Sequence, residues 1–249
     1  MASSGYLTGM NWPSPEVRTS TGSTNADVEL LANAGAPVGT SVIADEQTAG
    51  RGRLGREWVS PPQSGLWMSV FVSPSRPVAE WGWIPLIAGI AVVRAIEETT
   101  NTLLALKWPN DVVIPGSAAT NDAAGLKLGG ILAERIDRGA VIGIGVNISM
   151  EQLPVPTATT LAAQGLSVSR DALAAAVLRS LEDLLTQWET HSVADEYLAL
   201  CSTVGKPVRV VRPEHEDLIG TATGIDSDGH LIVDNSIVVA AGDVTHLLV

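Results

Sequence analysis

Apolar residues along the chain recur either at every second position, as in half-buried strands, or at helical spacing, as in packed helices. Up to residue 148 this pattern predicts a series of short strands interrupted by two helices. The strands are expected at 17–21, 40–45, 66–72, 103–108, 111–114, 128–136 and 141–148, and the helices at 25–34 and 84–98. The second helix is strongly apolar and has Pro85 in its first turn, so it is expected to be buried.

The pattern changes in the last third of the chain. Residues 157–200 are rich in Ala and Leu at helical spacing, whereas short apolar runs follow Cys201. These runs, at 207–211, 220–225, 231–233 and 237–240, are separated by turn signals such as Asp228-Gly229. The order of elements predicts an α+β domain over residues 1–200 and a small β barrel over 201–249.

Composition narrows the class of protein. The formal net charge of −12 argues against a sequence-independent grip on nucleic acid, which depends on Lys and Arg at phosphates. A single cysteine, Cys201, excludes an internal disulfide and fits a reducing compartment. The N-terminus lacks the basic start and apolar stretch of a signal peptide, and the apolar segment 81–93 is too short to span a bilayer. These features predict a cytoplasmic protein that binds neither DNA nor membranes.

A loop rich in Gly and Arg, residues 50–56, reads GRGRLGR. It formally matches the dinucleotide-binding fingerprint, but it runs into Pro61-Pro62 instead of opening a helix. A Walker A loop is excluded because no Gly-Lys-Ser/Thr closes it. Three arginines on a flexible backbone suit a polyanion that arrives and leaves. A solvated basic turn is the alternative.

Lysine is rare, since the fifteen basic residues include only Lys107, Lys127 and Lys206. Lys107 opens the segment KWPND, which presents a cation, an amide and a carboxylate at a strand end, as ATP and Mg²⁺ require. For this segment taken alone, a structural salt bridge with an Asn-Asp turn is the favoured explanation. Lys127 opens KLGGIL, where Gly129 and Gly130 indicate close approach of a ligand or of another backbone, or else a bulge beside a solvated lysine.

Together these segments resemble the biotin–protein ligase family. The matching pieces, in order, are Ser23-Thr24-Asn25, DEQTA at 45–49 leading into GRGRLGREW, KWPND at 107–111, KLGGIL at 127–132 and GIGVN at 143–147. The resemblance implies a class II synthetase-like catalytic domain, with a mixed sheet flanked by helices, and an SH3-like C-terminal barrel. It implies that ATP and Mg²⁺ convert biotin to biotinyl-5'-AMP, and that biotin passes to a lysine of a biotin carboxyl carrier domain. It also implies a short form without the DNA-binding domain of some relatives, monomeric or weakly dimeric.

The resemblance assigns roles to individual residues. The biotin-binding set is Ser23, Thr24, Asn25, Gln47, Gly50, Arg51, Gly52, Arg53, Lys127, Gly129, Gly130 and Leu132. The ATP-binding set is Arg53, Arg56, Trp58, Lys107, Asn110, Lys127 and Asn147. The catalytic set is Lys127, Arg51, Arg53, Lys107 and Asp111, of which Asp111 is also the candidate Mg²⁺ ligand. Trp58 is expected to pack on the adenine, and Lys127 to bridge the biotin carboxylate and the α-phosphate.

Two departures and several alternatives stay open. The loop at 115–125 is longer than the family leads us to expect, and no arginine stands near Leu248, where relatives often carry one. Lipoate ligation shares the fold and the adenylate chemistry, whereas octanoyl transfer through Cys201 is disfavoured because that residue lies at the domain boundary. A transcriptional repressor and a biotin-binding protein without catalysis are the alternatives from other classes. The number of basic residues around the expected site argues against simple binding of a small monoanion.

Overall fold

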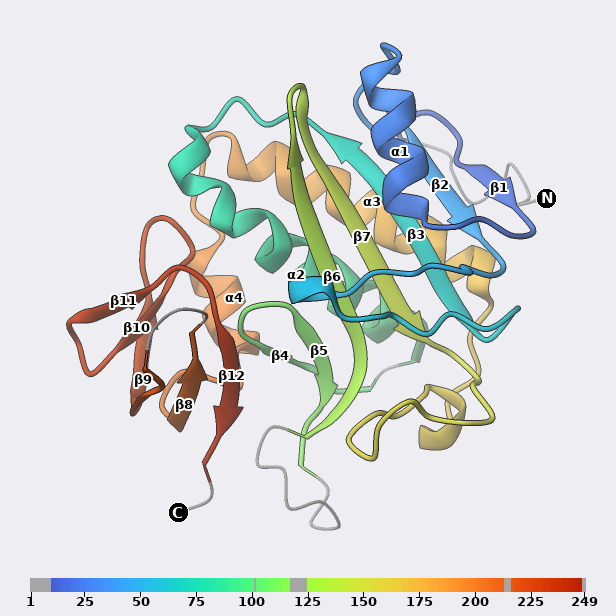
Figure 1. The fold of residues 1–249 in the computed structure, drawn as a ribbon. Coiled ribbons are helices and arrows are strands. Elements are labelled where there is room, and N and C mark those ends of the chain that lie inside the picture. Colours follow the sequence, from blue (N-terminus) through green and yellow to red (C-terminus); the bar gives the residue numbers. More distant parts are fainter. Residues whose placement is uncertain (1–9, 101, 117–124, 213–215, 248–249) are drawn as a thin grey trace.

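A seven-stranded mixed sheet, ordered β1-β2-β3-β7-β6-β5-β4, forms the larger part of the protein (Figure 1). The structure is a computed structural model that describes residues 10–100, 102–116, 125–212 and 216–247. The strands are β1 (Glu16–Arg18), β2 (Ser41–Ala44), β3 (Gly65–Val72), β4 (Ala105–Lys107), β5 (Asp111–Ile114), β6 (Leu126–Ile136) and β7 (Gly139–Asn147). Among the described strands β1 and β2 pair in parallel, and the other neighbours in this sheet are antiparallel.

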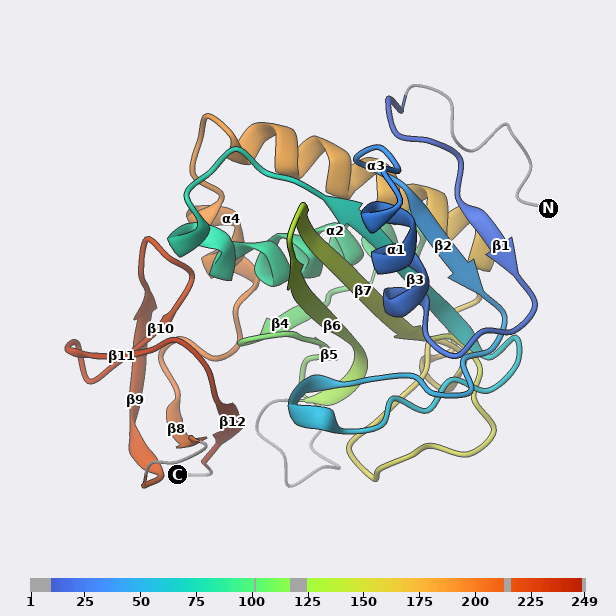
Figure 2. The same cartoon turned by 45° about the horizontal axis from the view of Figure 1, so that its top comes forward.

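Helices cover both faces of this sheet (Figure 2). They are α1 (Thr24–Asn33), α2 (Trp83–Thr100), α3 (Arg170–Trp188) and α4 (Ala194–Leu200). Helix α1 packs Val28 and Ala32 on one face, whereas α2 and α3 cover the other. Since side chains alternate along a strand, Ile142, Ile144 and Val146 of β7 enter the core beneath α2 and α3. The glycines between them therefore face the side that carries α1, where they leave room for other groups.

Helix α2 is buried in the core, as the sequence predicts. Twelve of its residues, from Trp83 to Ile96, are buried, and their side chains pack against the sheet and α3. The segment Val78–Thr100 is long and apolar enough to cross a membrane by length and composition, but 67% of its most apolar window is buried inside the protein. This burial accounts for its hydropathy as that of a core helix.

The C-terminal part is a five-stranded antiparallel sheet, ordered β11-β10-β9-β8-β12. Its strands are β8 (Pro207–Val211), β9 (Leu218–Ile225), β10 (Leu231–Val233), β11 (Ile237–Val239) and β12 (Asp243–His246). Two tryptophans of the larger part hold it in place: the Trp83 Nε1 donates to Ser227 O at 2.9 Å, and the Trp108 Nε1 to Gly229 O at 3.1 Å. One continuous hydrophobic core spans both parts, so the strand β12 is held at a defined place beside the first sheet.

The observed elements confirm the predicted α+β fold, with a C-terminal domain of the SH3-like class. Two predictions were wrong in detail. The pattern does not predict β12, whose four residues include one apolar residue, Val244. Residues 157–161, predicted as helical, lie outside the α-helices: Ala158 forms an isolated parallel bridge with Lys127, and backbone hydrogen bonds join the segment to Lys127 and Asn147 at the ends of β6 and β7. The boundary at residue 200/201 stays a prediction, and residues 117–124 and Leu248 lie outside the described residues.

Candidate active site

A cavity of about 570 Å³ opens on the α1 side of the large sheet, next to the C-terminal domain. Its walls come from β6, β7, the Gly-Arg loop, the KWPND turn, residues 154–158 and the start of β12. The predicted residues that line it are Ser23, Thr24, Asn25, Gln47, Arg51, Gly52, Arg53, Arg56, Trp58, Lys107, Asn110, Asp111, Lys127, Gly130, Leu132 and Asn147. Gly50 and Gly129 do not line it. Gly129 is packed so closely against Gly145 O that a Cβ would lie 2.6 Å from that oxygen.

The side chain of Asn25 lies over a first row of three residues that are neighbours across adjacent strands. Strand register places Ser69 of β3, Gly143 of β7 and Leu132 of β6 side by side. The Asn25 amide lies directly over Gly143, where a Cβ would overlap its Oδ1. The Ser69 hydroxyl donates to Asn25 Oδ1 at 2.5 Å, and Asn25 Nδ2 donates to Glu134 Oε2 at 2.6 Å. Gly143 is therefore required by the side chain that covers it.

The adjacent row holds Trp58. Here the register places Trp67, Gly145 and Gly130 side by side. The Trp58 indole lies over the two glycines, and a Cβ on Gly145 would come within 2.6 Å of its ring. Lys127 Nζ lies 5.4 Å from the centre of the Trp58 ring, and Trp67 meets the same ring edge-on at 6.4 Å. The two glycines thus leave space for the Trp58 indole, which itself lines the cavity.

The N-terminus of α1 contributes a polar, uncharged wall. Thr24 and Asn25 are buried, and the Thr24 N–H donates to Gln47 Oε1 at 2.9 Å. Gln47 Nε2 donates in turn to Ser60 Oγ at 2.9 Å, which fixes which end of the Gln47 amide faces Thr24. Buried groups held in this way offer a ligand donors and acceptors in set positions.

The opposite end of the cavity is cationic. Lys127 Nζ forms an ion pair with Asp111 Oδ1 at 2.6 Å, and Lys107 stands opposite Asp111 in the β4–β5 register. The bulge considered for this segment does occur, as a register shift near Lys127 in β6. The Lys127 side chain, however, is paired and half-buried rather than solvated. Asn110 donates to Ile131 O at 3.0 Å and accepts from Arg53 Nη1 at 3.3 Å. The KWPND turn therefore makes the predicted structural contacts and also borders the cavity.

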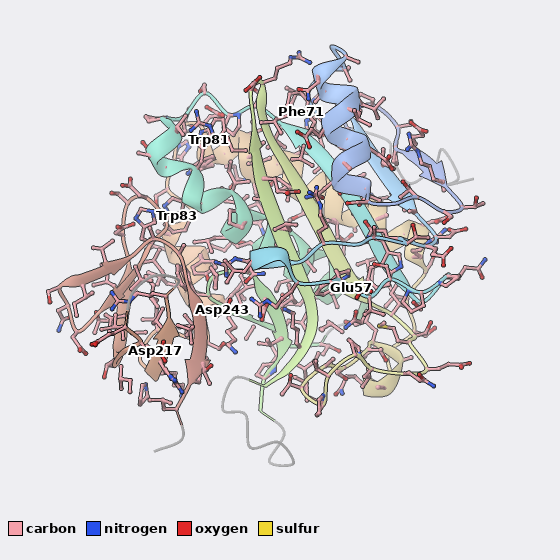
Figure 3. The ribbon with its side chains drawn as sticks, viewed as in Figure 1. Glu57, Phe71, Trp81, Trp83, Asp217 and Asp243 are labelled. Carbon is pink, nitrogen blue, oxygen red and sulfur yellow. The ribbon has the colours of Figure 1, made fainter. Side chains whose placement is uncertain are left out.

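The Gly-Arg loop folds over this end through a 3-10 turn at Arg53–Gly55. Arg56 Nη2 donates to both oxygens of Asp243 of β12, at 2.7 and 2.6 Å, and Figure 3 shows Asp243 beside the loop. Arg53 Nη1 donates to Gly242 O at 3.2 Å and lies 3.9 Å from Asp243. Burial lowers the pKa of Arg53, because desolvation outweighs the attraction of nearby carboxylates. A desolvated cation of this kind favours an incoming anion.

Three residues with polar contacts to the predicted site were not expected from the sequence: Asp243, which lines the cavity, and Ser69 and Glu134, which bind Asn25 from behind the lining. Glu134 follows Leu132 by two positions on β6, so strand alternation alone was a signal for it. Ser69 and Asp243 gave no such signal, because strand pairing brings Ser69 to Asn25 and domain packing brings Asp243 to the cavity. Among the described residues no group of three or more His, Cys, Asp or Glu side chains is placed to hold a metal.

Comparison with known proteins gives consistent matches. Residues 17–151 match the Biotin/lipoate A/B protein ligase family, and residues 203–247 match the biotin protein ligase C-terminal domain. The biotin–[acetyl-CoA-carboxylase] ligase of Mycobacterium tuberculosis is 39% identical over 96% of this chain and 91% of its own length. The bifunctional ligase/repressor BirA of Bacillus subtilis is 34% identical over 86% of this chain and 67% of its own length.

Two solved structures extend the comparison to the fold. The biotin protein ligase from Aquifex aeolicus in complex with biotin and ATP superposes with a TM-score of 0.79 at 24% identity, over 95% of this chain and 99% of that chain. The ligase from Leishmania major in complex with biotinyl-5-AMP gives 0.64 at 28% identity, over 95% and 99%. With two family domains in order and a relative 39% identical over nearly its whole length, this chain belongs to the biotin protein ligase family.

Proposed function

We propose that this chain is an ATP-dependent biotin–protein ligase, which forms biotinyl-5'-AMP and transfers biotin to a lysine of a biotin carboxyl carrier domain. The observation that carries the proposal is a single cavity with two unlike ends. One end is an uncharged hydrogen-bonding wall around Thr24 and Asn25, suited to the polar rings of biotin. The other end gathers lysines and arginines, suited to a triphosphate.

The biotin side is assigned to the polar residues around the start of α1, to Leu132 of the first row and to Gly130 of the adjacent row. Ser23, Thr24 and Gln47 supply donors and acceptors for the polar edge of the biotin bicycle, and Leu132 and Gly130 line its apolar side. The Trp58 indole, seated over Gly145, borders both ends and is placed to pack on the adenine. Asn147, also in the cavity wall, has its amide held by a 3.0 Å bond to Thr159 O.

The chemistry of the first step explains the cationic end. The carboxylate of biotin attacks the α-phosphorus of ATP, a new C–O–P bond forms, and pyrophosphate leaves with the electron pair of the broken P–O bond. Two anions must meet, so fixed cations that stabilise the charge at the reacting phosphate lower the barrier. Lys127 is assigned the bridging position between the carboxylate and the α-phosphate, with Arg53, Arg51 and Lys107 around it. The loop over this end shields the reactive anhydride from water.

Magnesium fits this cavity as an ion that arrives with the nucleotide. Such ions need one or two protein carboxylates and take their remaining ligands from phosphates and water. Asp111 supplies one carboxylate within the cavity, although one of its oxygens is engaged by Lys127 in the ligand-free protein. When bound, the ion would neutralise charge on the phosphates. Asp111 would hold it there, beside Asn110.

In the second step a neutral lysine amine of the carrier attacks the acyl carbon, and AMP leaves. Asp111 is the candidate group to orient or deprotonate this amine. The carrier is assigned as the biotin carboxyl carrier domain of biotin-dependent carboxylases, and the cytoplasm as the place where the enzyme meets it. No role for DNA is proposed, because the net charge of −12 opposes a phosphate grip.

Pyrophosphate release from ATP and Mg²⁺ tests the proposal, with biotin, lipoate or octanoate added separately. Release that depends on biotin alone is the expected result. Release with lipoate instead would keep the fold and the adenylate chemistry but overturn the assignment of the polar wall. Tight binding of biotin without release from any acid would show that the lysines and arginines have been misassigned.

A further inference from the structure

Glu134 of β6 is a charged residue at the cavity margin to which neither the sequence nor the proposed chemistry gives a role. It lies on the same face of β6 as Gly130 and Leu132, because side chains alternate along a strand. Its Oε2 accepts from Asn25 Nδ2 at 2.6 Å and from Arg51 Nη2 at 3.1 Å. One carboxylate oxygen therefore joins the buried wall of the biotin side to the Gly-Arg loop.

We propose that Glu134 is a positioning residue for biotin, which sets the hydrogen-bond polarity of the pocket wall and holds the Gly-Arg loop against it. The inference deepens the proposed function and rests on it. Glu134 is assigned no contact with the reacting atoms. It acts through the side chains of Asn25 and Arg51.

The charge of the Glu134 carboxylate determines which neighbouring groups donate and which accept. An ionised carboxylate can only accept, so Asn25 must turn its Nδ2 toward Glu134 and its Oδ1 toward Ser69. The single hydroxyl proton of Ser69 is then committed to Asn25 Oδ1. At the 2.7 Å contact between Thr24 Oγ1 and Ser69 Oγ the Thr24 hydroxyl is therefore the donor, and it shares its one proton with Gln47 Oε1 at 3.1 Å. With its proton engaged, the Thr24 hydroxyl offers a ligand an acceptor only. Asn25 Nδ2 has one further acceptor, Leu132 O, at the longer distance of 3.4 Å, so Glu134 at 2.6 Å is the stronger of the two groups that set this order.

The same hydrogen-bond network also contacts the Gly-Arg loop at both of its sides. Arg51, near the start of the loop, binds Glu134 directly. Gln47, which precedes the loop, joins Thr24 to Ser60, which follows it and whose hydroxyl donates to Trp58 O at 3.2 Å. Both sides of the loop are thus tied to the wall whose polarity Glu134 determines. Loss of the carboxylate should therefore affect biotin binding and loop order together.

The test compares Glu134→Gln, which removes the charge at nearly constant shape, with Glu134→Ala, which removes both contacts. The matched control is Glu80→Gln, which breaks a half-buried pair with Arg76 (3.0 Å) that takes no part in the cavity. Biotin affinity is measured by calorimetry, and KM for biotin and ATP by pyrophosphate release. Hydrogen exchange reports the order of residues 47–58 in the ligand-free protein.

Both Glu134 variants are expected to bind biotin about tenfold or more weakly, because bonds to a charged group are lost. KM for biotin should rise in proportion and by a larger factor than KM for ATP, and loop exchange should accelerate. Glu80→Gln should match the wild type in all of these. Biotin affinity within about twofold of wild type in both variants, or an equal rise in KM for both substrates, would overturn the positioning role alone. A wild-type protein that neither binds biotin nor releases pyrophosphate would overturn the proposed function itself.

Discussion

Adding one methyl group at either of two neighbouring glycines should damage the two ends of the cavity separately. Gly143 lies beneath the Asn25 amide, and Gly145 lies beneath the Trp58 indole. Both face the cavity side of β7, two positions apart, in a backbone region that accepts alanine. The substitutions Gly143→Ala and Gly145→Ala therefore probe the biotin side and the nucleotide side with the same chemical change.

The size of each effect follows from the clash. A Cβ at Gly145 would lie 2.6 Å from the Trp58 ring, which must retreat by about 0.8 Å to reach ordinary contact at 3.4 Å. At Gly143 the Cβ overlaps Asn25 Oδ1, and relief would disturb the bonds of Asn25 to Ser69 and Glu134. Overpacking of this kind costs about 1–3 kcal/mol, which corresponds to roughly 5-fold to 150-fold in a binding constant.

Steady-state pyrophosphate release gives KM for biotin and for ATP in each variant. Gly145→Ala should raise KM for ATP by roughly 5-fold to 150-fold and leave KM for biotin within about threefold. Gly143→Ala should raise KM for biotin by the same range and leave KM for ATP within about threefold. Gly224→Ala in β9 is the matched control, since its Cβ would meet only Ile232, at 3.7 Å. Equal effects of the two cavity variants on both substrates, or the absence of any difference from Gly224→Ala, would refute the separation of the cavity into two rows.

Further predictions concern the cations, the domain contact and the core. Asp243→Asn should lower KM for ATP by about twofold to fivefold, because Arg56 would no longer have to leave the partly exposed Asp243 carboxylate before it binds phosphate. An unchanged or higher KM for ATP would contradict this competition between carboxylate and phosphate for Arg56. Lys127→Gln should reduce kcat/KM for pyrophosphate release by about 100-fold or more, and a loss below about tenfold would remove its bridging role. Leu181→Ala, at a fully buried position of α3, should lower the free energy of unfolding by about 2–5 kcal/mol in urea titrations; a change below about 1 kcal/mol would contradict its place in the core.

The arrangement of the strands followed largely from local pattern. The apolar alternation of β3 and β7 and the apolar helix α2 are long enough for their periods to be read, and each was predicted close to its observed bounds. Residues 157–161 were misassigned because they adjoin the Ala- and Leu-rich stretch and were included in it, while their backbone donors and acceptors pair with Lys127 and Asn147. This pairing involves residues distant in sequence, which a local pattern does not report.

The site could be predicted as motifs but not as contacts. The segments GRGRLGREW, KWPND and KLGGIL do converge on one cavity, as expected of a shared ligand. Gly129 and Gly130 of KLGGIL were expected to lie close to a ligand. Gly130 instead lies beneath the side chain of Trp58, as does Gly145, and Gly143 lies beneath that of Asn25. Asp243 reaches the cavity only because the C-terminal domain docks beside the sheet, which no local pattern reports.

Ligation to a carrier tests the central claim most directly. The protein, ATP and Mg²⁺ are incubated with a biotin carboxyl carrier domain and either biotin or lipoate, and the carrier is analysed by intact mass and peptide mapping. A carrier in which the target lysine is replaced by arginine serves as the control. Biotin attached to that lysine, dependent on ATP and absent from the control and the lipoate reaction, is the predicted result. An unmodified carrier, under conditions where biotin-dependent pyrophosphate release proceeds, would contradict the claim that this chain is a biotin–protein ligase.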